Sequence, residues 1–175
     1  DLSKDPSKHQ LLGGCVSAGP MVNDKAQYLE LRGAMHALQI DTGSQGAMLR
    51  ALGAVLHLGD LEFQALAVPG SDAGSGIGKS GASGKAIEAL GPLLGVEKAL
   101  LEKALCSKIV VEHEVPVVPA EAANARSALA KGMYSRLFDW TLRKVNGALA
   151  TGGQSRAKRD AKTHFIGLLD IFGFE

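Results

Sequence analysis

The stretch FIGLLDIFGFE, residues 165–175, contains the most apolar run of the chain and decides the fold class. Residues 165–169 are nearly all apolar, which is typical of a strand buried on both faces of a parallel sheet. Asp170 interrupts this run and Gly173 follows it. Ligands of open α/β sheets bind just beyond the carboxyl ends of the strands, so this junction suits a carboxylate near Mg²⁺ and a backbone N–H aimed at a phosphate. A strand that simply enters a turn explains the same residues.

The longest helix that the sequence predicts lies upstream of this strand, over about residues 122–148. At 1.5 Å per residue it would be about 40 Å long. Its apolar coverage is wide, as in helices that are buried on more than one side. The stripe and its widened edge consist of Leu129, Met133, Leu137 and Val145 together with Tyr134, Phe138 and Leu142.

Four motifs in order carry a resemblance to one family. DIFGFE, residues 170–175, resembles the second nucleotide-sensing switch of myosin motor domains. The helix sequence ALAKGMYSRLFDWTLRKVNGAL (128–149), the apolar helix LRALGAVLHLGDLEF (49–63) and LLGV (93–96) are similar to the family in the same order. The resemblance covers most of residues 25–175 and implies an α/β fold. The chain would be a mostly helical fragment of a P-loop NTPase-type motor head, comprising much of the upper 50-kilodalton region plus one strand of the central sheet.

The resemblance also implies a function, that of an actin-based motor that hydrolyses ATP with Mg²⁺ in the cytoplasm, associated with the cytoskeleton. Asp170 would lie in the outer shell of the Mg²⁺, without direct metal ligation by this chain. The Gly173 amide would hydrogen-bond the γ-phosphate, and Glu175 would pair with an arginine of the first switch. The family's phosphate loop and first switch lie upstream of these motifs, so we expect the isolated chain to be inactive. Light chains or calmodulin would bind parts outside it.

The loop over residues 106–119 corresponds to a family loop on the actin-facing surface. Lys108, Glu112, His113 and Glu114 are therefore candidates for actin contact. From the residues alone, the apolar segments 109–111 and 115–118 on either side of Glu112-His113-Glu114 indicate a small hairpin or loop, which Pro116 restricts to an edge. An exposed hairpin with no partner is an equally good interpretation.

AGSGIGKS, residues 73–80, ends like the phosphate-binding loop G-x-x-x-x-G-K-[ST] but begins with Ala73 instead of glycine. One hypothesis makes it a working loop of a self-standing nucleotide-binding protein, with Lys79 and Ser80 in the usual roles and Asp170 as the partner carboxylate. The motif order favours the other hypothesis, in which residues 69–84 are a Gly/Ser-rich surface loop of a motor fragment. A third reading is a non-catalytic structural or binding module.

Composition excludes several other classes of function. The net charge of +1 over 175 residues gives no electrostatic argument for nucleic acid, and no apolar run approaches the ~18 residues of a membrane span. Cys15 and Cys106 lie far apart, and neither they nor the five histidines have a metal-ligand spacing. The chain begins with Asp1 and ends within its most apolar region, which predicts a piece of a longer polypeptide.

The remaining residues predict a series of short helices. Asn23 or Asp24 is expected to cap a first helix, and a second follows over about 44–58, with Met48, Leu49, Leu52, Val55 and Leu56 on its apolar face and Gly59 at its end. Residues 61–68 suggest a short strand. Residues 87–94 and 96–106 suggest two helices separated by Gly95, and residues 1–22 suggest a surface segment.

Overall fold

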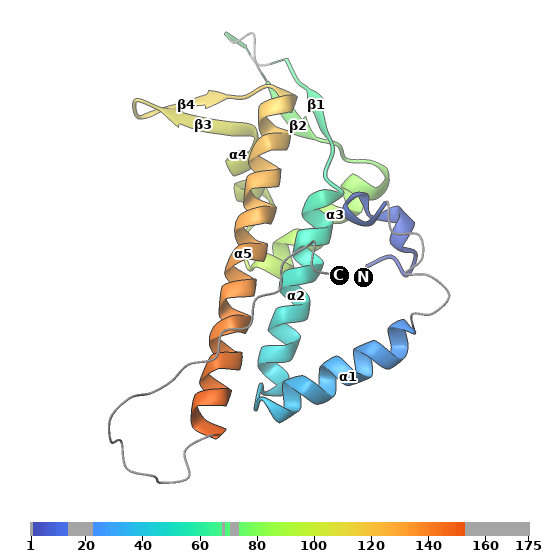
Figure 1. The fold of residues 1–175 in the computed structure, drawn as a ribbon. Helices are drawn as coiled ribbons and strands as arrows, with labels where there is room; N and C mark the ends of the chain where they lie inside the picture. Colours follow the sequence, from blue (N-terminus) through green and yellow to red (C-terminus); the bar gives the residue numbers. More distant parts are fainter. Residues whose placement is uncertain (1, 14–22, 68, 71–73, 153–175) are drawn as a thin grey trace, which may run out of the picture.

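The computed structural model describes residues 2–13, 23–67, 69–70 and 74–152, and this part of the chain is mostly helical. Two 3₁₀ turns, η1 (Pro6–Lys8) and η2 (Gln10–Leu12), precede α1 (Asp24–Ala37) and α2 (Thr42–Gly59). A hairpin of β1 (Phe63–Ala65) and β2 (Ser75–Ile77) leads into α3 (Gly81–Leu94) and α4 (Lys98–Cys106). A second hairpin, β3 (Ser107–Val110) and β4 (His113–Pro116), precedes α5 (Pro119–Gly152). Figure 1 shows α5 running alongside α2, with the second hairpin projecting from one end.

Helix α1 begins where Asn23 predicts, and α2 begins at Thr42, slightly before the predicted start at about 44. The Asn23 side chain accepts a hydrogen bond from the Ala26 amide (3.1 Å), and Asp41 accepts one from the Ser44 amide (2.9 Å), so each cap satisfies an otherwise unpaired N–H of the first turn. Met35 is the buried residue of α1. The corner between the helices is closed by Gln45, whose side-chain amide donates to the Ile40 carbonyl (2.8 Å).

The buried face of α2 differs from the predicted one. The predicted apolar residues are partly buried or exposed, whereas the interior face consists of Leu58 together with small and polar residues: Gln45, Gly53, Ala54, His57 and Gly59. Helix α2 packs against both α3 and α5, and small side chains allow helices to approach closely. Gly59 is the last helical residue, and the cap is Asp60 in a right-handed conformation instead of a left-handed glycine.

The region 69–84 is a shorter loop than the sequence predicted. Ser75–Ile77 form β2, which pairs antiparallel with β1 in the register Phe63↔Ile77 and Ala65↔Ser75. Both Ser75 and Ile77 are buried, and helix α3 already begins at Gly81. The correction has a simple physical reason: the apolar Ile77 gains free energy by joining the core, and the small residues beside it fit an extended strand.

Gly95 separates α3 from α4 as expected. It adopts a left-handed conformation (φ 68°), and its N–H bonds to the Gly91 carbonyl, which is the usual way for a glycine to end a helix. The two helices contribute Ile87, Leu90, Leu101 and Leu105 to the core, together with Leu58, Leu61, Ile77, Ala54, Ala86 and Ala130. The core therefore lies where α2, α3, α4 and the first half of α5 meet.

Helix α5 is longer than predicted, with 34 residues, or about 50 Å. Ala122 and Ala130 in its first half are buried, whereas Tyr134, Phe138 and Leu142 are exposed, Phe138 by 61%. The expected burial on several sides therefore holds only near the core. The mostly helical composition agrees with the predicted class, and the described strands form two antiparallel pairs. The expected central-sheet strand and switch, 164–175, lie outside the described residues, as do residues 1 and 14–22.

Candidate functional site

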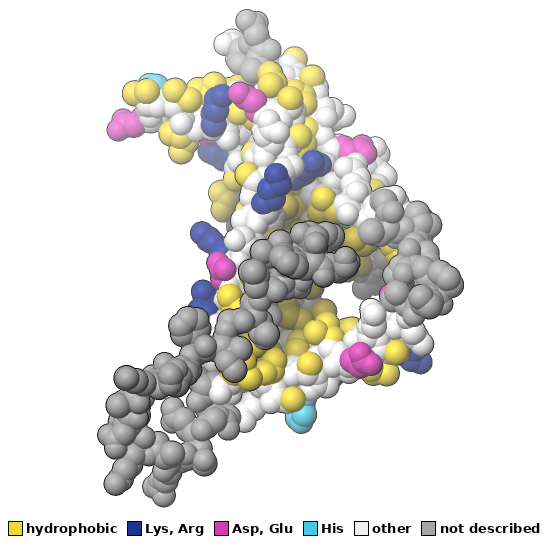
Figure 2. All heavy atoms as spheres, in the orientation of Figure 1, with side chains coloured by type: hydrophobic (Ala, Val, Ile, Leu, Met, Phe, Trp, Pro, Cys, Tyr) yellow, Lys and Arg dark blue, Asp and Glu magenta, His cyan; other side chains and the backbone are white. Residues whose placement is uncertain are grey.

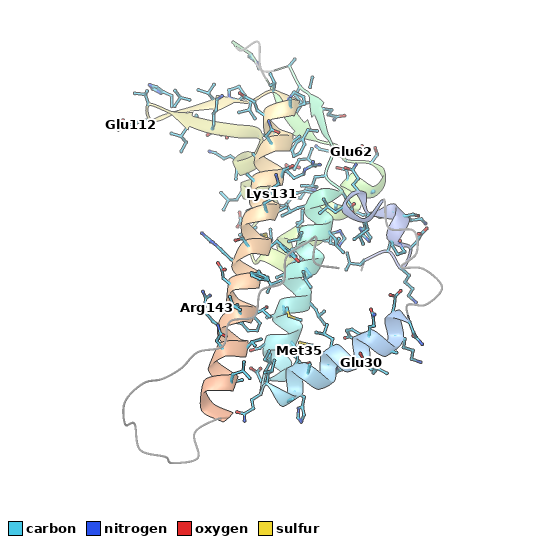
Figure 3. The ribbon with its side chains drawn as sticks, viewed as in Figure 1. Glu30, Met35, Glu62, Glu112, Lys131 and Arg143 are labelled. Carbon is cyan, nitrogen blue, oxygen red and sulfur yellow. The ribbon has the colours of Figure 1, made fainter. Side chains whose placement is uncertain are left out.

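The hairpin of β3 and β4 projects away from the helices at the N-terminal end of α5 (Figure 1). Its register places Lys108 opposite Val115, Ile109 opposite Glu114, and Val110 opposite His113. The Val117 amide donates to the Cys106 carbonyl (3.1 Å) and closes the base. Figure 3 labels Glu112 at the tip, far from the helices. The sequence prediction of a hairpin within 106–119 is thus met by a regular antiparallel pair.

The tip is a two-residue turn with an unusual backbone. Val111 (φ 46°) and Glu112 (φ 67°) both have left-handed conformations. A turn of this kind matches the twist of the flanking strands but strongly favours Asn-Gly or similar pairs, because it needs positive φ at both positions. A β-branched residue is a rare occupant of this region. The chain therefore accepts local strain to hold a valine at the outermost point of the hairpin.

Charged and hydroxyl side chains fasten the base of the hairpin. Glu114 Oε2 lies 2.6 Å from Lys103 Nζ on α4, and its Oε1 lies 2.8 Å from Ser107 Oγ. The pKa of the Glu114 carboxyl is lowered below its usual value, mainly by the hydrogen bond from Lys103 and to a lesser extent by that from Ser107. On the other side, Lys108 Nζ lies 3.0 Å from Glu121 Oε1 on α5. Both ion pairs are exposed, so each adds little to stability, but together they orient the hairpin.

The four predicted contact residues therefore divide into two groups. Lys108 and Glu114 make ion pairs within the chain at the base, whereas Glu112 and His113 are exposed at or beside the tip. Two apolar residues of the hairpin were not predicted as contacts: Ile109 is 80% exposed and Val111 is 86% exposed. Figure 2 shows these hydrophobic atoms along the projecting hairpin. Apolar residues in a sequence favour burial, so their exposure became visible only in three dimensions.

AGSGIGKS does not have the geometry of a phosphate-binding loop. Such a loop turns several backbone N–H groups toward one anion, whereas residues 75–77 form an extended strand in which successive amides point in opposite directions. The Gly78 amide donates to the Glu62 carbonyl (2.8 Å) instead. Lys79 is exposed, and Ser80 precedes α3 without a side-chain capping bond. Ala73 lies outside the described residues.

The predicted nucleotide residues Asp170, Gly173 and Glu175 also lie outside the described residues. Within the described ranges, no group of three or more His, Cys, Asp or Glu side chains could hold a metal ion. The Cys106 thiol is half-buried, and burial raises its pKa. In the same part of the chain, no helix has an apolar stretch sufficient to span a bilayer.

An apolar cavity of about 550 Å³ lies between α2, η2 and α5. Val55 and Gly59 of α2, Leu11 of η2, and Tyr134 and Phe138 of α5 contribute to its lining. Arg126 borders it and donates hydrogen bonds to the carbonyls of Gly59 (3.3 Å) and Leu61 (2.7 Å). This arginine satisfies backbone acceptors at the end of α2, where helical carbonyls lack partners.

Comparison with known proteins gives one consistent result. The model of the myosin head (motor domain) matches residues 2–175. The chain is similar to Myosin-6 of Arabidopsis thaliana, with 35% identity over 98% of the chain and 11% of the relative. It is 38% identical to Myosin-16 of Arabidopsis thaliana over 88% of the chain and 12% of the relative. It is 33% identical to Unconventional myosin-Ia of Mus musculus over 99% of the chain and 16% of the relative. The chain thus spans between 11% and 16% of the length of these relatives.

Proposed function

The chain belongs to the myosin head (motor domain) family, and we propose that it is part of an actin-based motor that couples ATP hydrolysis to movement along actin filaments. In this proposal the chain supplies an actin-facing hairpin and a switch that senses the γ-phosphate. The motor would act in the cytoplasm on the cytoskeleton, with light chains or calmodulin bound to parts outside this chain.

The projecting hairpin is the observation that carries the actin side of the proposal. Its tip combines exposed apolar side chains, Ile109 and Val111, with the charged or titratable Glu112 and His113. An exposed apolar centre with a polar surround is the usual composition of a protein interface. The ion pairs of Lys108 and Glu114 tie the base to α5 and α4, so the tip is presented in a defined direction. Lys108 and Glu114 therefore act in positioning, and the residues at the tip make the contact.

The nucleotide side of the proposal rests on family membership and on the sequence of residues 170–175. ATP with Mg²⁺ would be bound mainly by parts of the head outside this chain. Asp170 would lie in the outer shell of the metal, and the Gly173 amide would donate to the γ-phosphate. Glu175 would pair with an arginine of the first switch. Positioning and charge stabilisation are the main requirements of phosphoryl transfer, and a switch held by the γ-phosphate is released on hydrolysis.

Actin cosedimentation of the full-length protein tests the actin side. Changing both Ile109 and Val111 to serine removes apolar area that would be buried at an interface, and we expect about a tenfold loss of affinity, or about 1.4 kcal/mol. Leu29→Ser, at an exposed leucine on α1, is the matched control and should leave affinity within about twofold. Equal affinities of the double variant and the parent protein would remove the hairpin from the actin interface.

Nucleotide turnover of the full-length protein tests the switch. We expect Gly173→Ala to impair hydrolysis strongly, because a Cβ at this position would crowd the switch against the phosphate. Steady-state ATPase rates with and without actin would measure the effect. Unaltered turnover in this variant would contradict the role proposed for Gly173.

A further inference from the structure

Three titratable side chains are buried together at the C-terminal end of α2. His57 lies in the last turn, Asp60 is the cap, and His9 comes from the segment 2–13; they are 7%, 4% and 4% exposed. His9 Nδ1 lies 2.6 Å from Asp60 Oδ2. The Gln10 amide donates to Asp60 Oδ1 (2.9 Å). One buried carboxylate thus holds the N-terminal segment by two hydrogen bonds.

The same segment closes one side of the apolar cavity. Leu11 lies directly over Gly59: a Cβ built on Gly59 would come within 2.5 Å of Leu11 Cγ. Leu11 also contributes to the cavity wall opposite Tyr134 and Phe138 of α5. Detachment of residues 2–13 would therefore uncover Gly59 and open the cavity between α2 and α5.

Protonation of His57 would add a charge to a buried junction. The His9 and His57 rings lie edge to face with centroids 6.2 Å apart, and among the described residues the buried His9 Nε2 has no hydrogen-bond partner. In the neutral tautomer, His9 donates its Nδ1–H to Asp60 and leaves only a lone pair at Nε2. Both oxygens of Asp60 already bind the N-terminal segment, so a proton on His57 would add a buried positive charge beside this pair, and the Arg126 guanidinium of α5 lies near Gly59 and Leu61. Asp5 and Lys8 of the segment itself are exposed.

We propose that His57, His9 and Asp60 form an acid-sensitive latch, which holds residues 2–13 against the end of α2 at neutral pH and releases them when His57 is protonated. The latch does not depend on the proposed motor activity. It would couple the charge of one buried imidazole to the opening of the apolar cavity.

The direction of the pH effect follows from His57. Burial lowers its pKa from the usual 6.5; the Asp60 carboxylate opposes this, and His9 adds to it. A histidine whose pKa is depressed in the folded state binds its proton more readily after release. The latch is therefore fully stable above pH 6.5 and loses stability as the pH falls from 6.5 through the lowered pKa.

Amide hydrogen exchange in the full-length protein tests the latch, with rates corrected for the intrinsic effect of pH. The reporters are the Gln10 amide, bound to Asp60, and the Leu12 amide, bound to the His9 carbonyl. We expect protection of both to fall by more than about threefold between pH 7.5 and 5.5, because the released state binds the His57 proton more tightly. His57→Gln should keep protection constant within about twofold over this range. His36→Gln, at an exposed histidine of α1, should behave like the parent protein.

Two further measurements keep the test decisive. Asp60→Asn should lower the protection of Gln10 at every pH, because it removes the charge that holds the segment. If His57→Gln fails to fold, the His57 ring can be followed by NMR titration in the parent protein, where its protonation must coincide with the loss of Gln10 protection. Protection that does not change with pH, or that changes apart from the His57 titration, would overturn the latch.

Discussion

The two hairpins of the described structure have similar backbones and opposite surroundings. The β1–β2 hairpin lies against the core, where Ser75 and Ile77 are buried and contact with α4 covers β2. The β3–β4 hairpin instead projects from the N-terminal end of α5, and Ile109 and Val111 are almost fully exposed. An isolated two-stranded hairpin is marginally stable in water. The first gains stability from burial, whereas the second is attached at its base by the Val117–Cys106 backbone hydrogen bond and by weak, exposed ion pairs. The pattern of residues along the strands alone therefore says little about whether a hairpin packs against the core or is exposed to a partner.

Truncating one isoleucine in each hairpin should give the largest contrast. Ile77→Ala removes buried methyl groups next to the core and should cost about 3 kcal/mol, since the space cannot collapse fully. Ile109→Ala removes an exposed side chain and should cost less than about 0.5 kcal/mol. Hydrogen exchange of the strand amides in the full-length protein would measure both local free energies. Equal costs would mean that the two hairpins are supported in the same way.

The turn of the second hairpin offers a smaller and opposite effect. Replacing Val111-Glu112 by Asn-Gly supplies residues suited to positive φ and should stabilise the hairpin by about 1 kcal/mol, or about fivefold slower exchange of the Val110 and His113 amides. Glu112→Val, which places a second β-branched residue in the left-handed region, should act in the reverse direction. If the Asn-Gly variant is more stable yet binds actin less tightly, the apolar tip is kept for contact at the expense of stability.

The smallest effect should come from Lys79, beside the first hairpin. Because residues 75–77 form a buried strand instead of an anion-binding loop, we expect Lys79→Ala to change the ATPase rate of the full-length protein less than about twofold. Steady-state turnover with Lys85→Ala, at a neighbouring exposed lysine, provides the baseline. A loss of a hundredfold or more would restore AGSGIGKS as a phosphate site and would end the contrast between a structural and a functional hairpin.

Local signals in the sequence predicted much of this architecture. The Asn23 cap, the break at Gly95 and the hairpin within 106–119 are each determined by a few neighbouring residues, and the structure contains all three. The prediction of the buried face of α2 was wrong because helical periodicity gives weight to large apolar residues. Where three helices approach closely, packing selects the small ones, Gly53 and Ala54, for burial.

The site was predictable only in part, for a related reason. The polar character of Glu112 and His113 predicted that they lie on the surface. The exposure of Ile109 and Val111 runs against their apolar character, because it depends on how the hairpin projects. The contact between His9 and Asp60 joins positions 51 residues apart, and no spacing rule signals a single pair of that kind. The roles of Asp170, Gly173 and Glu175 stay predictions from the sequence.

Helix α5 has a mechanical consequence. It starts three residues after the second hairpin ends, and its last residue, Gly152, is followed in the sequence by the segment that carries Asp170 and Gly173. A continuous helix resists bending, so a tilt imposed at the hairpin would be delivered at the far end as a displacement of about 0.9 Å per degree over a ~50 Å rod. Ser127 and Thr141 bond back to the carbonyls of Ala123 and Leu137, an arrangement that often bends helices. We expect the helix to bend first at these two positions. Substituting both with alanine would stiffen the helix, so that a tilt at one end would be transmitted more fully to the other.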